Sequence, residues 1–348
     1  MTAAESDSQF SWDPLITALE RIATSARSNI SKPHQYHFVS ALQARPAQVA
    51  YHRWSASGQI GPEPIVPRAA IRAMIYDISR TAGELSAFCK VVSLVTVEFA
   101  EAAANAFRRG NIVLGCAALR CLIERIAHAA AIANALNGVT HIPLPSKAPL
   151  NPILEVAGII RKALYGTQRE WADLTKVDFR SSSPKDVVYR KKEDTADVSA
   201  VNVLNDVDKL TKQVAGARFI YEILCEFLHP NVGDLFGSSL RGSDGWDNHG
   251  TRHLTRTIGF GPKIFSGFPD MQLIMKEVAE ISIEIVEVGL RILPGLESTA
   301  TYVVRVTRKN QHQILGKYRR FFRNSDLCPC LSGFSVKDCG RAKLIRRP

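Results

Sequence analysis

The stretch NIVLGCAALRCLIERIAHAAAIANAL, from Asn111 to Leu136, decides the fold of this chain. Nearly every residue in it is apolar or small, and a helix this apolar is buried on most of its sides. Gly110 predicts the end of the preceding helix, and Asn111 can cap the new one. Asn137 and Gly138 predict its end. We therefore expect this stretch to be the central helix of a mainly α-helical bundle. The residues expected to be nearly fully buried in the core are Leu114, Ala118, Leu122, Ile126, Leu224 and Phe227.

Further helices are predicted on both sides of the central helix from their spacing and end signals. Asp13-Pro14 begins one near the N-terminus, and Asp270 caps another that Pro294-Gly295 ends. The other expected helical segments are 68–81, 84–109, 151–165, 201–214 and 218–229. The remaining long segments are predicted to be irregular (31–67), a loop (167–196) and a glycine-rich hairpin insertion (233–269).

Length and composition are those of a folded protein with a sizeable core: 348 residues, 46% hydrophobic and 22% charged. No apolar run reaches membrane-spanning length without charge, and the N-terminus is acidic and polar, so we expect a cytoplasmic protein with no membrane partner. We divide the chain into N-terminal helices with an irregular segment packing on the body (1–82), a helical bundle (83–298) and a basic tail (299–348). The sequence is compatible with a homo-oligomer.

The net charge of +11 is concentrated in the tail. Residues 301–348 contain 12 Lys or Arg and 2 Asp or Glu, a net of +10, whereas the first 300 residues contain 32 and 31, a net of +1. An acidic partner would therefore meet the tail, where interleaved basic and aromatic residues can pair with phosphates and stack on bases. The alternative is a solvated cationic tail, or a helix whose aromatic residues are core. The candidate nucleic-acid-binding residues are Lys317, Arg319, Arg320, Arg323, Lys337, Arg341 and Lys343.

The tail also holds three of the seven cysteines, and this clustering suggests metal binding rather than disulfides. The other four lie in apolar helical segments, where buried thiols are expected. The segment Cys328-Pro329-Cys330-Leu331-Ser332-Gly333, followed after five residues by Cys339, resembles the SEC-C motif, a small zinc knuckle.

The SEC-C resemblance implies a zinc ion held by Cys328, Cys330 and Cys339, in a module that docks on proteins or on the ribosome. The family has His or Cys directly after the last cysteine, where this chain has Gly340. Because structural zinc takes four ligands, the fourth would be a water or a residue from elsewhere, such as His312. The alternative is a knuckle without metal, held by the packing of Phe334 and Val336.

Two polar stripes interrupt the apolar helices. Arg120, Glu124 and His128 are spaced i, i+4, i+8 and share one face of the central helix. The second stripe lies on one narrow face of a later helix and contains Arg218, Glu222, Glu226 and His229. If the stripes face one another, they form a buried cluster that could cleave RNA, with His229 as general acid or base and Arg120 stabilising the developing charge. The alternative is two solvent-exposed faces with local ion pairs.

The body has an Ala-rich helix with Arg-x-x-x-Glu and a helix end Leu-Cys-Glu-Phe-x-His-Pro-Asn. In these features it resembles uncharacterised bacterial helical proteins that often carry SEC-C tails. These proteins are distantly similar to the HEPN class of helical bundles, which includes many ribonucleases. The HEPN catalytic motif has a shorter spacing than the seven residues between Arg120 and His128, so the resemblance supports the fold more than catalysis.

Two functions remain open from the sequence. The first is a bacterial cytosolic binding protein whose tail docks on nucleic acid, on the ribosome or on a partner protein. The second is a HEPN-like, metal-independent ribonuclease or a toxin or phage-defence effector. We favour the first, because a strict catalytic motif is missing. The candidate catalytic residues for the second are Arg120, Glu124, Glu226, His229 and Asn231.

Overall fold

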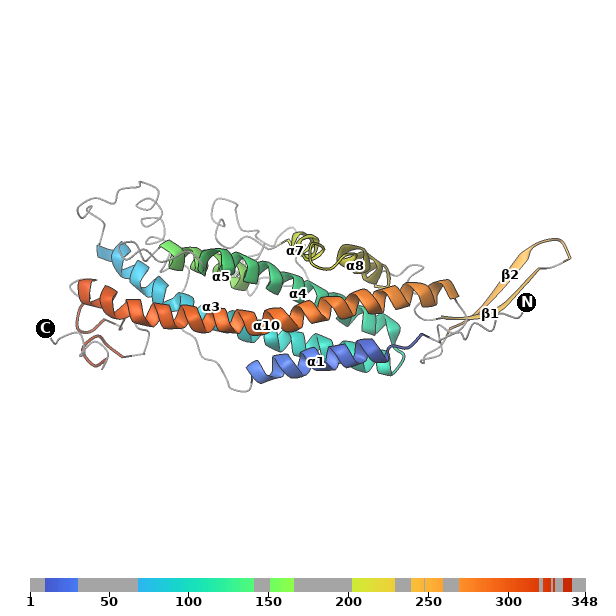
Figure 1. Ribbon diagram of the computed structural model, residues 1–348, viewed down its shortest axis with the longest axis horizontal. Coiled ribbons are helices and arrows are strands. Elements are labelled where there is room, and N and C mark those ends of the chain that lie inside the picture. Colours follow the sequence, from blue (N-terminus) through green and yellow to red (C-terminus); the bar gives the residue numbers. More distant parts are fainter. Residues whose placement is uncertain are drawn as a thin grey trace, which may run out of the picture. The chain divides into compact units, whose positions relative to one another are not determined.

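The structure is a computed structural model in which residues 10–30, 68–140, 151–165, 202–228, 239–246, 248–258, 269–318, 322–326, 328 and 334–339 are described (Figure 1). These residues are mainly helical, as predicted. The helices are α1 (Asp13–Asn29), α3 (Arg68–Arg108), α4 (Ile112–Thr140), α5 (Asn151–Tyr165), α7 (Val203–Leu210), α8 (Ala217–Glu226) and α10 (Pro269–Tyr318). The expected hairpin is antiparallel and consists of β1 (Ser239–Trp246) and β2 (Arg252–Ile258).

The chain divides into two compact units, each assembled from three segments. Unit 1 contains Met1–Pro33, Lys90–Ala133 and Asn202–Gly295. Unit 2 contains the remaining segments, His34–Cys89, Asn134–Val201 and Leu296–Pro348. The linear division expected at residues 82 and 298 stays a prediction. Among the described helices, none has both the length and the apolar character needed to cross a membrane.

The first part of α4 belongs to the core of unit 1. Leu122 is fully buried and Ile126 is 2% exposed, as predicted for a central helix. Three other residues predicted to be core, Ala118, Leu224 and Phe227, are also buried. The same prediction is wrong for Leu114, which is 53% exposed because it lies on the face of α4 that also carries the exposed Arg125.

The turn between α3 and α4 follows its sequence signals. Gly110 has a φ of 70° and donates its N–H to the Phe107 carbonyl at 3.0 Å. The N–H of Asn111 reaches the Ala106 carbonyl at 2.8 Å, so both bonds of a Schellman motif are present. Asn111 Oδ1 then accepts the N–H of Leu114 at 3.2 Å and caps α4. Local chemistry alone therefore sets this corner.

Close helix packing in unit 1 depends on Gly289 in α10. A Cβ at this position would lie 2.7 Å from Ile22 Cδ1 on α1 and 3.0 Å from Ile126 Cδ1 on α4. Both distances are shorter than an ordinary carbon–carbon contact, so a larger residue here would force the ends of these two isoleucine side chains to move within a closely packed core. At the start of α1, the Trp12 ring stacks on Phe107 of α3, with centroids 4.2 Å apart.

Several predicted helix ends are wrong. α3 continues through Gly83 instead of breaking between 81 and 84, α4 passes Gly138, and α10 passes Pro294. α1 begins at Asp13, but Trp12 occupies the cap position. A proline inside a helix costs about 3 kcal/mol. In α10, residues on both sides of Pro294 are buried, including Leu293 and Leu296, and this packing offsets the local cost.

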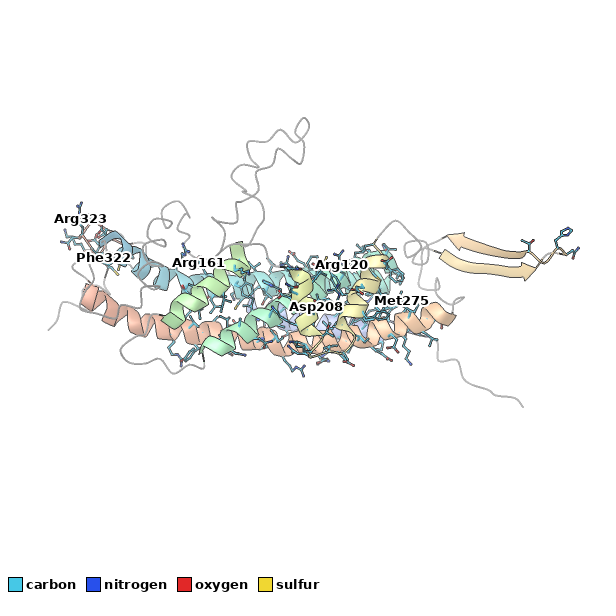
Figure 2. All side chains as sticks on the ribbon, turned by 90° about the horizontal axis from the view of Figure 1, so that it is seen from above. Arg120, Arg161, Asp208, Met275, Phe322 and Arg323 are labelled. Carbon is cyan, nitrogen blue, oxygen red and sulfur yellow. The ribbon has the colours of Figure 1, made fainter. Side chains whose placement is uncertain are left out.

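Unit 2 contains a buried ion cluster between α3 and α5. Glu84 is 0% exposed, and its Oε1 lies 2.8 Å from Arg80 Nε. Its Oε2 lies 3.8 Å from Nε of Arg161, the α5 residue labelled in Figure 2. A buried carboxylate is tolerated only with such partners, and the ion pair between Glu84 and Arg161 links α5 to α3.

Candidate functional site

The α4 stripe forms a three-residue polar cluster with α8 in unit 1. Arg120 Nη2 lies 3.3 Å from Glu124 Oε1 and donates to the Tyr221 hydroxyl at 3.2 Å. The Tyr221 hydroxyl in turn donates to Glu124 Oε1 at 2.7 Å. The Arg120 guanidinium, labelled in Figure 2, lies 5.3 Å from the centroid of the Tyr221 ring. Each member of the cluster therefore contacts the other two.

Hydrogen bonding and burial raise the pKa values of Arg120, Tyr221 and the neighbouring Cys121. The hydrogen bond with Tyr221 is the main cause that raises the pKa of Arg120. Burial raises the pKa of Tyr221, and the hydrogen bond to Glu124 acts in the same direction against the opposing effect of Arg120. The neighbouring Cys121 thiol also has a raised pKa because of burial. Tyr221 is thus a hydrogen-bond donor at neutral pH, and Cys121 is a thiol rather than a thiolate.

The third residue of the α4 stripe pairs with α7. His128 Nδ1 lies 2.9 Å from Asp206 Oδ2, and Lys209 Nζ lies 3.1 Å from Asp206 Oδ1. Asp206 is only 4% exposed. Burial by itself raises the pKa of Asp206, but hydrogen bonds and charges from His128 and Lys209 outweigh it and leave the pKa lowered. The whole α4 stripe is therefore engaged with α7 and α8.

The second stripe has a different environment. Arg218 Nε lies 2.7 Å from Glu222 Oε1, and Arg218 Nη1 lies 3.1 Å from Oδ1 of Asp208, which Figure 2 labels on α7. Glu222 and Glu226 are both exposed. The α8 residue that meets Arg120 and Glu124 is Tyr221, which belongs to neither stripe. His229 and Asn231 lie outside the described residues, so the shared catalytic pocket stays a prediction.

Two contact residues were missed by the sequence analysis. Tyr221 and Asp206 were not singled out, although each is a polar side chain on the buried side of an apolar helical pattern. That placement was the available signal, because a buried polar group needs a partner. Their partners are on α4, many residues away in the chain, and this pairing follows only from the tertiary fold.

The described part of the tail is a small hydrogen-bonded module. The Cys328 N–H donates to the Phe334 carbonyl at 2.8 Å, and the Val336 N–H donates to the Asp326 carbonyl at 2.8 Å. The chain then forms a helical turn in which the Cys339 N–H donates to the Ser335 carbonyl at 2.9 Å. Cys328, Val336 and Cys339 are at most 2% exposed. We call residues 322–339 the knuckle.

Two of the three predicted zinc ligands can be placed. Cys328 and Cys339 are buried in the knuckle, while Cys330 and the departure at Gly340 lie outside the described residues. Within the described residues there is no group of three or more His, Cys, Asp or Glu that could hold a metal. Buried thiols are the donor type that structural zinc prefers, and the role of Cys330 as a third ligand stays a prediction.

The structure contradicts one alternative, a metal-free knuckle held by the packing of both Phe334 and Val336. Packing of both Phe334 and Val336 was expected to hold a knuckle without metal, but Phe334 is 59% exposed and only Val336 is buried. Among the predicted nucleic-acid-binding residues, Arg323 and Lys337 are exposed, and Lys317 lies in the last turn of α10. The other members of that set lie outside the described residues: Arg319, Arg320, Arg341 and Lys343.

Comparisons of this chain with protein-family models, with curated proteins and with solved structures found no match.

Proposed function

We propose that this protein binds nucleic acid through its basic tail, with the helical body as the scaffold. The observation that carries the proposal is the charge distribution. The last 48 residues, 301–348, have a net charge of +10 out of a total of +11. Such a concentration of positive charge attracts a polyanion and releases its counterions on binding.

The body supports this assignment because several of its exposed arginines are paired with carboxylates. In unit 1, Arg21 Nη1 lies 2.7 Å from Glu287 Oε1, an ion pair that joins α1 to α10. Two further ion pairs join α1 to α3, and they are Arg27–Glu101 and Arg108–Glu20. These exposed pairs add little stability, but they cancel charge, so the body offers a weaker field to a phosphate backbone.

The two carboxylates of the tail take part in the local fold of the knuckle. Asp326 Oδ2 accepts the backbone N–H of Arg323 at 2.6 Å, and Asp338 Oδ2 accepts the Ser335 hydroxyl at 2.5 Å. Both acids are thus positioned by the knuckle itself, while the side chains of Arg323 and Lys337 are exposed to solvent. This arrangement leaves cations available for phosphates.

Zinc would have a structural role in this function. Cys328 and Cys339 would hold it together with Cys330, and the metal would tie residues 328–330 to Cys339 at the end of the knuckle. The exposed cations of the knuckle would then be presented on a rigid base. We therefore include zinc in the proposal as a structural cofactor.

The test is a matched pair of charge variants in the full chain, measured by fluorescence anisotropy with labelled RNA. The tail variant replaces four cations by glutamine, at Lys317, Arg319, Arg320 and Arg323. The control makes the same charge change on exposed residues of the body, at Arg109, Lys212, Lys276 and Arg291. We expect the tail variant to lose most of its affinity and the control to keep it. Equal losses in the two variants would contradict the proposal. A protein that binds a protein partner and no RNA would show that the proposed class of partner is wrong.

The ribonuclease alternative is supported by one contact. Arg120 and Glu124 lie 3.3 Å apart with side chains 33% and 26% exposed, so solvent can reach them. If they are catalytic, Arg120→Lys, which keeps the charge, should lower RNA cleavage without weakening RNA binding. Cleavage that is unchanged in this variant would count against this alternative.

A further inference from the structure

An exposed aromatic ring lies on the knuckle. Phe334 is 59% exposed, while its carbonyl accepts the Cys328 N–H in the paired part of the module. Val336, two residues further on, is 2% exposed, so the inner side of the module is filled by Val336 and not by the Phe334 ring. The ring is therefore held on the outside of the knuckle by a fixed backbone and is not part of its core.

Two cations belong to the same part of the knuckle. Lys337 donates its N–H to the Asn324 carbonyl at 3.0 Å, which places it beside the segment that begins at Arg323. Both side chains are exposed, and Figure 2 labels Arg323 at the start of the knuckle. Phe322, the residue directly before Arg323, is 5% exposed and belongs to the core. An exposed ring and two exposed cations thus share a module with a small, hydrogen-bonded frame.

We propose that this surface, formed by Arg323, Phe334 and Lys337, binds single-stranded nucleic acid. The Phe334 ring stacks on one unpaired base, and the two cations pair with the neighbouring phosphates. Aromatic rings beside positive charge are the usual means of holding single strands, because every base has a face on which a ring can stack. The inference rests on the proposed function and specifies which form of nucleic acid the tail selects.

The chemistry favours a single strand over a duplex. In a duplex, both faces of each base are covered by neighbouring base pairs, so a ring can stack only after a base is unstacked. The phosphates of a duplex remain accessible, and Arg323 and Lys337 can still pair with them. The cations thus contribute to the binding of both forms of nucleic acid, whereas the ring contributes only to the binding of the single strand.

The test compares substitutions at Phe334 in the full chain. The probes are labelled single-stranded RNA and DNA of about 12 nucleotides, within the size that such modules cover, and a duplex of the same sequence. We expect Phe334→Ala and Phe334→Leu to weaken single-strand binding about 5- to 150-fold. Phe334→Trp should retain it, and duplex binding should change less than twofold. RNA and DNA single strands should respond alike.

The matched control is Phe219→Ala on α8, because Phe219 is 63% exposed but lies in the body. It should leave binding to all probes unchanged. The far-UV helical signal and the zinc content should be the same in all Phe334 variants, because the substituted ring is exposed.

The possible results separate this inference from the broader one. If Phe334→Ala binds single strands as tightly as wild type while the tail charge variant still loses affinity, the stacking site is wrong and the proposed function stands. Equal losses for single strand and duplex would also overturn the stacking site. If wild type binds none of the probes, both are wrong.

Discussion

Replacing Asp206 by Asn tests whether the contact between Asp206 and His128 of the α4 stripe stabilises the fold. Asp206 is 4% exposed and accepts hydrogen bonds from His128 at 2.9 Å and from Lys209 at 3.1 Å. A hydrogen bond to a charged group contributes about 1.5–3 kcal/mol. The Lys209 side chain is 59% exposed, so its share is small and the bond to His128 dominates. We therefore expect Asp206→Asn to lower the free energy of unfolding by about 1.5–3 kcal/mol at neutral pH, measured by urea denaturation.

The pH dependence of this loss gives a second check. Despite the effect of burial, hydrogen bonds from His128 and Lys209 lower the pKa of Asp206 below its ordinary value of 3.8. The folded state therefore favours the ionised carboxylate, and its contribution is fully present above the unfolded-state pKa. As the pH falls through the folded-state pKa, wild type loses this contribution and the difference from Asp206→Asn should shrink.

The control for this measurement is Asp208→Asn on the same helix. Asp208 is exposed and pairs with Arg218 at 3.1 Å, so the same chemical change should shift the urea midpoint much less. If Asp206→Asn is as stable as wild type, or if its loss is the same above and below the ordinary carboxyl pKa, the buried charged contact between α4 and α7 is not what stabilises this part of unit 1.

Three further outcomes follow from other parts of the structure. Leu122→Ala should lower the free energy of unfolding by about 2–5 kcal/mol, because it leaves a cavity at a fully buried position; a cost below about 1 kcal/mol would contradict the central placement of α4. Glu84→Ala should lower the free energy of unfolding by about 3–5 kcal/mol in chemical denaturation, because it removes the buried carboxylate that lies beside Arg80 and Arg161. Elemental analysis of the purified protein should find zinc that Cys328→Ser removes while the far-UV helical signal is kept, and zinc-free wild type would refute the metal site.

The fold could be predicted where the signals are local. Gly110 and Asn111 form the corner that their residue types indicate, since a positive φ and a side-chain cap need no distant partner. The predicted stop at Pro294 failed because its cost of about 3 kcal/mol is smaller than the gain from packing on both sides. Leu114 shows the reverse case, an apolar residue on a face that the fold leaves exposed. Both outcomes depend on tertiary packing, which cannot be inferred from local sequence signals.

The same distinction applies to the candidate sites. The Arg120–Glu124 pair follows from i, i+4 spacing and is present at 3.3 Å. Tyr221 contacts both residues from α8, and this contact could not be predicted, because it depends on how two distant segments pack. In the knuckle, the cysteine spacing indicated a compact module, whereas the exposure of Phe334 emerged only with the backbone pairing.

The measurement that tests the central claim most directly is the salt dependence of RNA binding by the full chain. For a single strand, the slope of log K against log salt is about −0.7 for each phosphate neutralised. Glutamine at Lys317, Arg319, Arg320 and Arg323 removes four cations, so the slope should become shallower by up to about 3. The matched body variant should keep the wild-type slope. A wild-type affinity that does not change with salt, or a tail variant with the wild-type slope, would contradict binding of nucleic acid by the tail.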